Sequence, residues 1–259
     1  MLSHLKKRLG VLTAIAVLSA LVPVLAASPA SAAPSATLQL MADGANLSAC
    51  PASASIPSAG FTDTTSTDVD CIKYYGVTTG VTATTYEPAA SVSRWEMALF
   101  LTRLADVSGI TLGSGADQGF TDISGKSTAI QTAINQIKQL GVTTGKTATT
   151  YAPDDNVSRE EMAMFIERLA TATTAGPGGT SSNTAAGVAT TYINYVTTAT
   201  YSFTDIDAGD VTYEGHNSIV ELWHMGITDL GHYATAYRPA DTMTRAEMAT
   251  FMTNFLAHT

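Results

Sequence analysis

One arginine occurs at the same place in a four-residue pattern that appears three times in the sequence. The pattern is serine or threonine, arginine, any residue and glutamate, and it spans residues 93–96, 158–161 and 244–247. A serine or threonine with a glutamate three residues later forms a capping box, which begins a helix. The box explains its first and last residues but not the arginine, since a cation in the first helical turn opposes the helix dipole by roughly 0.3 kcal/mol.

The chemistry open to Arg94, Arg159 and Arg245 is recognition of a negatively charged group. A guanidinium holds a carboxylate or phosphate through two parallel hydrogen bonds, and a helix N-terminus also favours an anion. We expect at least one of these arginines to contact an acidic ligand. The alternative is a structural ion pair, for which three aspartates are internal candidates: Asp63, Asp122 and Asp205.

Those aspartates end a Phe-Thr-Asp triplet that recurs at residues 61–63, 120–122 and 203–205. They are interpreted first as loop or helix-capping residues and second as ligand contacts. Trp95 follows the first arginine and is the candidate for an exposed stacking residue, with packing between repeats as the alternative. Glu160 follows the second arginine, and its negative charge is expected to weaken Arg159 as an anion receptor.

Catalytic and metal-binding patterns are missing from the sequence. It contains no G-x-S-x-G, H-E-x-x-H or phosphate-loop motif, and nothing singles out two carboxylates for glycan hydrolysis. Three histidines recur at eight-residue intervals without metal-ligand spacing: His216, His224 and His232. We therefore expect a protein that is not an enzyme and has no metal or cofactor.

Each arginine lies in a unit predicted to fold as helix, loop and helix. Apolar residues seven, four and one positions before Gly76, Gly141 and Gly226 share one helical face, and the glycine suits a left-handed helix end. A connector to a second glycine follows at 76–80, 141–145 and 226–231, and the third copy is one residue longer. A tyrosine lies six residues further on in each copy and is expected in the core, with sugar stacking as the alternative: Tyr86, Tyr151 and Tyr237.

The second helix of each unit carries apolar residues at helical spacing, as at Met97, Phe100, Leu101 and Leu104. One helix pair cannot bury its apolar faces alone, so the copies are expected to pack on a shared core. The sequence predicts a mainly α protein with repeats at 61–107, 120–171 and 203–257 and with irregular spacers. The long spacer, 172–202, is rich in glycine and threonine, and its tail from 188 to 201 could form a strand or hairpin.

The N-terminal residues 1–32 are predicted to be a secretory signal peptide. Residues 6–8 are basic, residues 9–27 are apolar, and Ala-Ser-Ala at 30–32 suits cleavage. A membrane anchor is the alternative, and the small-residue site disfavours it. Loss of the three basic residues would change the net charge from −9 to −12. Such acidity argues against nucleic acid or an anionic membrane as partner.

The two cysteines, Cys50 and Cys71, are expected to form a disulfide, as is usual in an exported chain with few cysteines. The bond would fix the N-terminal segment, residues 33–60, to the first repeat. Closing its loop would contribute about 3 kcal/mol in the chain-entropy model.

The combined pattern resembles the S-layer homology domain family. The shared features are an F-x-D start, a helix ending in G-[IV]-x-x-G, an aromatic-x-P and a [ST]-R-x-E box, and the copies cover most of residues 61–257. The first repeat, with Tyr74-Tyr75-Gly76, is similar to actinobacterial members. This chain departs from the common form in its serines at 93 and 158 and in its long third spacer.

The resemblance implies a pseudo-threefold helical spindle that binds secondary cell-wall polysaccharide without a covalent bond. In relatives the ligand is a pyruvylated sugar held in grooves between repeats, and the arginine of the box is the main carboxylate contact. The corresponding residues here are Arg94, Arg159 and Arg245. The expected place of action is the cell wall or cell surface. The alternative is a structural envelope protein whose repeats pack together or against a surface-protein partner.

Overall fold

The computed structural model describes residues 49–50, 56–172, 201–230 and 234–257, and all of them fall in the unit that spans residues 33–259. The predicted signal peptide, most of the N-terminal segment and all of the 188–201 strand region except Tyr201 lie outside the described residues. The boundaries drawn between repeats therefore stay predictions.

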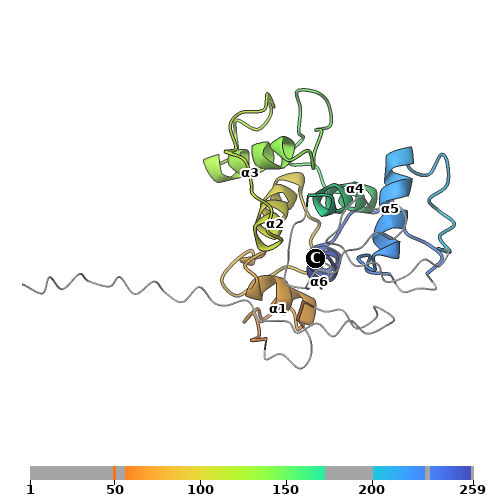
Figure 1. The fold of residues 1–259 in the computed structure, drawn as a ribbon. Helices are drawn as coiled ribbons and strands as arrows, with labels where there is room; N and C mark the ends of the chain where they lie inside the picture. The colour runs from red at the N-terminus through yellow and green to blue at the C-terminus, as the bar shows by residue number, and fades with distance from the viewer. Residues whose placement is uncertain (1–48, 51–55, 173–200, 231–233, 258–259) are drawn as a thin grey trace, which may run out of the picture. The chain divides into compact units, whose positions relative to one another are not determined.

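The described residues form a mainly helical protein, as the sequence predicts (Figure 1). The first helix of each repeat is α1 (Thr67–Tyr74), α3 (Thr128–Gln139) or α5 (Tyr213–His224). The second helix, which begins at the cap arginine, is α2 (Arg94–Val107), α4 (Arg159–Ala170) or α6 (Arg245–Ala257).

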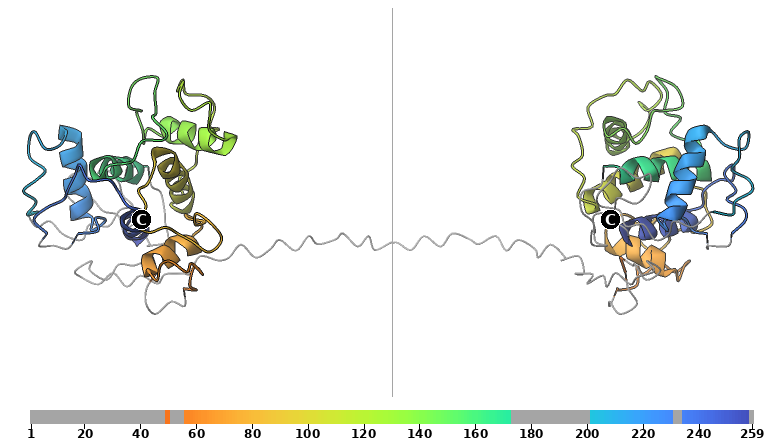
Figure 2. Two further views of the ribbon diagram at one scale, coloured as in Figure 1. Left: turned by 180° about the vertical axis from the view of Figure 1, so that it is seen from behind. Right: turned by 45° about the vertical axis from the view of Figure 1, so that its right-hand side comes forward.

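The main helix contacts run between neighbouring repeats rather than within one. Helix α2 packs on α3, α4 packs on α5, and α6 packs on α1, as the views in Figures 1 and 2 agree. The third repeat thereby returns to the first, so the contacts close into a cycle. The pseudo-threefold symmetry itself stays a prediction.

Backbone hydrogen bonds join the three segments that enter the second helices. The amide of Val92 donates to Met243 at 3.0 Å, that of Met243 to Val157 at 2.8 Å, and that of Val157 to Val92 at 2.9 Å. All three side chains are buried in the core. The loops that carry the arginines are thus fixed against one another.

The first helices end at their glycines in the predicted left-handed conformation. After α1, Gly76 has φ +74°, its amide donates to Lys73, and the amide of Val77 donates to Ile72. These two bonds are those of the Schellman motif, which satisfies carbonyl groups at a helix end. Gly141 and Gly226 repeat the pattern at α3 and α5.

The second glycine of the connector serves a different purpose. At Gly80, which has φ +85°, an added Cβ would lie 2.4 Å from Cε1 of Phe61 and 2.6 Å from the carbonyl oxygen of Thr82. Gly145 has the same relation to Phe120. The phenylalanine of the Phe-Thr-Asp triplet therefore packs directly over the connector of its own repeat.

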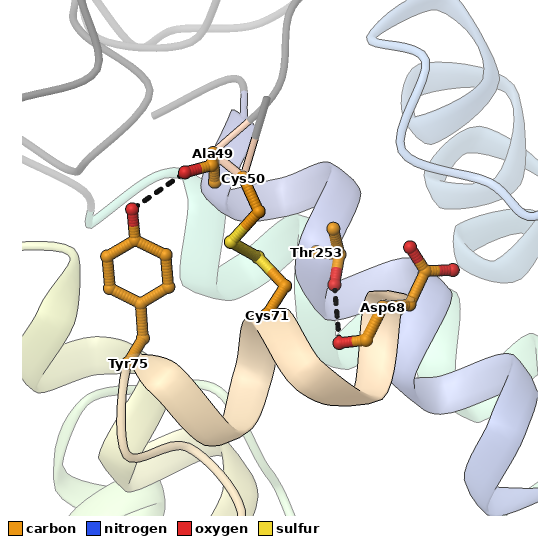
Figure 3. Close-up of a disulfide and its surroundings, with 6 residues drawn as sticks. All are labelled: Ala49, Cys50, Asp68, Cys71, Tyr75 and Thr253. Carbon is orange, nitrogen blue, oxygen red and sulfur yellow. Dashed lines mark hydrogen bonds between the residues drawn. A yellow bond between two sulfur atoms is a disulfide. The ribbon is translucent and has the colours of Figure 1, made fainter. Parts of the chain in front are cut away.

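The disulfide between Cys50 and Cys71 is confirmed, and it attaches the N-terminal segment to α1 (Figure 3). Beside it, the hydroxyl of Tyr75 donates to the carbonyl of Ala49 at 2.7 Å. On the neighbouring side of α1, the hydroxyl of Thr253 in α6 donates to the carbonyl of Asp68 at 3.2 Å. Helix α1 thus carries both the disulfide to the N-terminal segment and a hydrogen bond to the third repeat.

The apolar residues predicted for the helix faces form the core. Ile72, Ile134, Leu222 and Met97 are among those buried completely, together with the three repeat tyrosines. The prediction that these tyrosines are core aromatics is confirmed. No helix in the described ranges has the length and hydropathy needed to cross a bilayer.

Candidate ligand-binding site

Each cap arginine extends out of its own repeat and into the next one. Arg245 of the third repeat is only 3 % exposed and lies against the first repeat. Its Nε donates to the carbonyl of Tyr86 at 2.6 Å, and its Nη1 pairs with Oε1 of Glu96 at 2.9 Å. The guanidinium carbon lies 4.7 Å from the centre of the Tyr86 ring, within range of a cation–π interaction.

Arg94 and Arg159 make the same contacts with the repeats that follow them. Their Nε groups donate, both at 2.8 Å, to the carbonyls of Tyr151 and Tyr237 respectively. Their Nη1 groups pair with glutamates, Arg94 with Glu161 at 3.0 Å and Arg159 with Glu247 at 3.1 Å. Three equivalent ion pairs therefore connect the repeats in the same cycle as the helices.

The partner of each arginine is the glutamate of a capping box, not an aspartate. In the first repeat, Oε2 of Glu96 accepts from the amide of Ser93 at 2.9 Å, while Oε1 binds Arg245. The alternative of a structural ion pair thus named the wrong partners, because the arginines pair with glutamates and not with Asp63, Asp122 or Asp205. Sequence reasoning assigned the glutamates to capping alone, although a second carboxylate oxygen is always left over from a capping box.

The aspartates instead hold the turn that leads to the proline. Asp63 accepts from the amides of Tyr86 at 2.9 Å and of Glu87 at 2.8 Å, and Glu87 has the unfavourable φ of +59°. These backbone donors hold the pKa of Asp63 below its ordinary value. Asp122 and Asp205 bind the equivalent turns, where Ala152 and Arg238 are also left-handed. Their contact with a ligand stays a prediction.

The N-terminal amides of the second helices are already engaged. In α2 the amides of Arg94 and Trp95 donate to the carbonyls of Asp155 and Pro153, both at 2.9 Å, and the Glu96 amide donates to Ser93. Helices α4 and α6 follow the same pattern. An anion at these positions would therefore have to bind the guanidinium, because the first-turn amides are occupied.

A groove lies where Arg245 meets the first repeat. It has a volume of about 190 Å³, and its walls include the connector residues 78–81, Trp95 and Arg103. Trp95 is half-buried and packs partly on the core, and its stacking against a ligand stays a prediction. We call this space, lined by residues 78–81, Trp95, Arg103 and Arg245, the Arg245 groove.

One nitrogen of Arg245 is left over at this groove. Nη2 has no hydrogen-bond partner among the described residues, and it is not sealed from solvent. Nη2 of Arg94 is in the same condition. A guanidinium nitrogen that carries protons and is not completely sealed from solvent can donate to an incoming carboxylate.

Arg159 differs from the other two because a second carboxylate binds it. Oδ2 and Oδ1 of Asp229 accept from Nη1 at 3.0 Å and Nη2 at 2.7 Å, a bidentate pair. Burial would lower the pKa of Arg159, but the hydrogen bonds and charge of Asp229 outweigh it and raise the pKa. Asp229 was missed by sequence reasoning, although the extra residue of the third connector marks its position.

Glu160 binds the start of the third repeat, and its expected effect on Arg159 stays a prediction. Its Oε1 accepts from the amide of Thr212 at 2.8 Å and from the Thr212 hydroxyl at 2.7 Å, at the start of α5. Its carboxylate therefore helps to begin a helix of the third repeat. The contact that distinguishes Arg159 from the other two arginines is its bidentate pair with Asp229.

No metal-ligand cluster of His, Cys, Asp or Glu occurs within the described residues. His216 donates through Nδ1 to the carbonyl of Ile206 at 2.7 Å, and His232 lies outside the described residues. The histidine spacing therefore gains no support as a metal site among the described residues.

Comparison with known proteins bears on the middle of the chain. Residues 119–163 match the S-layer homology domain, which confirms the family resemblance seen in the sequence. An endoglucanase from Bacillus sp. (strain KSM-635) is 36% identical over 93 residues, which cover 36% of this chain and 9% of the endoglucanase. The chain thus spans less than a tenth of that relative. An S-layer homology domain indicates association with the cell wall or cell surface and is a binding module.

Proposed function

We propose that this chain, which carries an S-layer homology domain over residues 119–163, binds an acidic cell-wall polysaccharide without a covalent bond. In this proposal the chain is exported, acts at the cell surface as an anchor and is not an enzyme. A pyruvylated glycan suits the site, because its ketal carries a carboxylate on a compact sugar. The family assignment supports wall binding, and the site chemistry supports an anionic ligand.

The observation that carries the proposal is the unpaired Nη2 of Arg245 at the Arg245 groove. The rest of its guanidinium is fixed by Tyr86 and Glu96, so little conformational entropy would be lost when a ligand carboxylate binds. Trp95 forms an apolar wall on which a sugar ring can pack. Glu96 lowers the net positive charge of the groove, and Arg103, which also lines the groove, offsets this effect.

Arg94 offers the same unpaired nitrogen to the second repeat, with Lys146 close by. Lys146 Nζ pairs with Oε1 of Glu161 at 2.6 Å, the oxygen that Arg94 also binds. The lysine partly neutralises the glutamate and leaves the arginine more attractive to an anion. We therefore propose Arg94 as a second contact for the glycan.

A second candidate function is a structural envelope protein whose repeats serve packing alone. The burial of all three arginines and their internal ion pairs favour this reading. Under it, the leftover nitrogens bind only water and the protein associates with itself or with a surface protein.

Sedimentation with purified cell-wall sacculi separates the two functions. Protein lacking residues 1–32 should pellet with intact sacculi and stay in solution once acid extraction has removed the polysaccharide. Equal pelleting before and after extraction would favour the packing function.

Trp95→Ala tests the groove without removing a structural ion pair. Ala246 occupies the equivalent position of the third repeat, so alanine is compatible with the cap. The variant should bind sacculi about tenfold more weakly, equal to about 1.4 kcal/mol of lost contact. Tyr213→Ala is the control, because Tyr213 is 86 % exposed and is absent from the groove wall. Equal binding by both folded variants would contradict the groove assignment.

A further inference from the structure

We infer that Asp229 acts as a built-in ligand carboxylate which occupies Arg159, so that glycan binding falls to Arg94 and Arg245. The inference rests on the proposed function. It states which of the three cap arginines bind the glycan. Two of the three arginines are then available to bind the glycan, and the third is occupied by a carboxylate of the same chain.

The contacts of Asp229 are those that an acidic ligand would make. Its carboxylate engages Arg159 through two hydrogen bonds of 3.0 and 2.7 Å, and its side chain is only 12 % exposed. It takes the Nη2 that Arg94 and Arg245 leave unpaired. Arg159, which also pairs with Glu247, is completely buried.

The connector of the third repeat is built differently from the other two. Asp229 stands where the first and second repeats have Thr79 and Thr144, and Leu230 is the added residue. Those threonines are neutral, and their hydroxyls donate back to the next glycine carbonyl at 3.4 Å. They leave their facing arginine without a second anion.

A cation on the first helix is also replaced in the third repeat. Nζ of Lys73 and of Lys138 donates to the connector carbonyl of Thr79 at 3.1 Å and of Thr144 at 2.8 Å. The equivalent residue, three positions before Gly226, is Trp223. The third connector therefore lacks the positive charge that the first two keep beside them.

The second helix shows the same substitution of charge. Arg103 and Arg168 donate through Nη1 to connector carbonyls of their own repeats at 3.3 and 3.0 Å. Asn254 takes this place in the third repeat and donates to the carbonyl of Thr228 at 3.1 Å. Two cations are thus replaced by neutral residues and one anion is added beside Arg159, while Arg238 supplies one cation through its pair with Glu247 at 3.0 Å. The surroundings of Arg159 are therefore less positive than those of Arg94 and Arg245, which makes this position less favourable for an acidic glycan.

An external carboxylate would face two obstacles at Arg159. Asp229 is tethered to the site, and a tethered group competes at an effective concentration in the millimolar range or above. A ligand that displaced it would leave the largely buried carboxylate of Asp229 without its arginine partner, at a cost in free energy.

Titration calorimetry with Asp229→Asn tests the inference. The probe is the methyl glycoside of a hexosamine carrying a 4,6-pyruvate ketal, and the same glycoside without the ketal is its control. We expect Asp229→Asn to bind one more equivalent of the ketal probe per chain than the wild type. The control glycoside should show no such gain.

Two variants in which connectors are exchanged between repeats test the inference even if Asp229→Asn does not fold. Replacing residues 226–231 by the sequence of residues 76–80 should also add one equivalent, because that connector already folds in the first repeat. The reciprocal graft of 226–231 into the first repeat should remove one equivalent by closing the Arg245 groove. Circular dichroism and thermal unfolding establish that each variant is folded.

The outcomes separate the inference from the function it rests on. Wild-type binding of the ketal probe with unchanged stoichiometry in the folded variants would overturn the role of Asp229 alone. Absence of binding to both probe and sacculi by wild type and variants would overturn the proposed function together with the inference.

Discussion

At the scale of single residues, the buried guanidinium of Arg245 has to satisfy a neighbouring repeat before it can serve a ligand. Removing one partner of a buried ion pair leaves the other charge uncompensated, which costs about 3–5 kcal/mol. The groups left behind by Arg245→Ala are Glu96 and the carbonyl of Tyr86. Arginine at this position therefore stabilises the fold whether or not a glycan is present.

We expect Arg245→Ala to lower the free energy of unfolding by about 3 kcal/mol or more, measured by urea denaturation. Arg238→Ala is the matched control, since Arg238 is 47 % exposed in its pairs with Asp241 and Glu247. Its loss should cost less than about 1 kcal/mol. Similar losses in the two variants would argue against the ion pair as a connection between repeats.

The carboxylate of Asp63 should make stability depend on pH. Its pKa is lowered in the folded protein by the Tyr86 and Glu87 amides, so its contribution is present above the ordinary value of 3.8. That contribution is lost as the pH falls through the lowered pKa. The difference in unfolding free energy between wild type and Asp63→Asn should be constant near neutral pH and shrink in this acid range. A difference that does not change with pH would show that the ionised carboxylate has no such role.

At the same scale, the sequence indicated which residues matter but not always with what they pair. The three arginines were singled out from their unfavourable helix position, and the structure gives a reason for that position within the fold. Their partners lie in other repeats, as far as 149 residues apart for Arg245 and Glu96. Local spacing carries no information about such contacts, so the aspartates in the same repeats were considered instead.

At the scale of elements, the connector depends on a close approach between its second glycine and the aromatic ring of the triplet. Gly80→Ala would place a Cβ 2.4 Å from the Phe61 ring and also 2.6 Å from a backbone oxygen that cannot rotate away. We expect it to destabilise the protein by about 2 kcal/mol or more, from backbone strain and overpacking together.

Gly76→Ala is the control for that substitution. Gly76 also has a positive φ, of +74°, but an added Cβ would meet nothing within 4 Å. It should therefore cost only the backbone strain, about 1–2 kcal/mol, as measured by thermal unfolding. If the two glycine variants lose equal stability, the ring contact has no energetic role.

Helix positions and ends were predictable because their causes are local. Apolar spacing, capping boxes and glycine ends all act within a few residues, and α2, α4 and α6 begin at the predicted arginines. The choice of packing partner was not predictable. A helix pair within one repeat and a pair between repeats bury the same apolar faces, and the structure favours pairs between repeats.

At the scale of the whole molecule, the cycle of contacts predicts that the repeats unfold together. The chain has two tryptophans, Trp95 in α2 and Trp223 in α5, which report on the first and third repeats. Trp95→Phe leaves Trp223 as the only tryptophan, and Trp223→Phe leaves Trp95. In each variant, tryptophan fluorescence should show a single unfolding transition. Each transition should also match the loss of helical circular dichroism.

Separate transitions would contradict this cooperative account. A first repeat that unfolds before the helical signal is lost would mean that the α6–α1 contact and the Arg245–Glu96 pair do not join the ends of the cycle. Fluorescence and circular dichroism are compared within the same variant, so a change in stability caused by the Trp→Phe substitution affects both signals equally.

The most direct measurement is a crystal structure of the protein with the ketal-bearing glycoside bound. We expect the glycoside carboxylate within hydrogen-bond distance of Nη2 of Arg245, with the sugar against Trp95. We also expect that Asp229 remains on Arg159 and that no ligand is bound there. A carboxylate bound away from the arginines, or one that displaces Asp229 while the Arg245 groove is empty, would contradict the account.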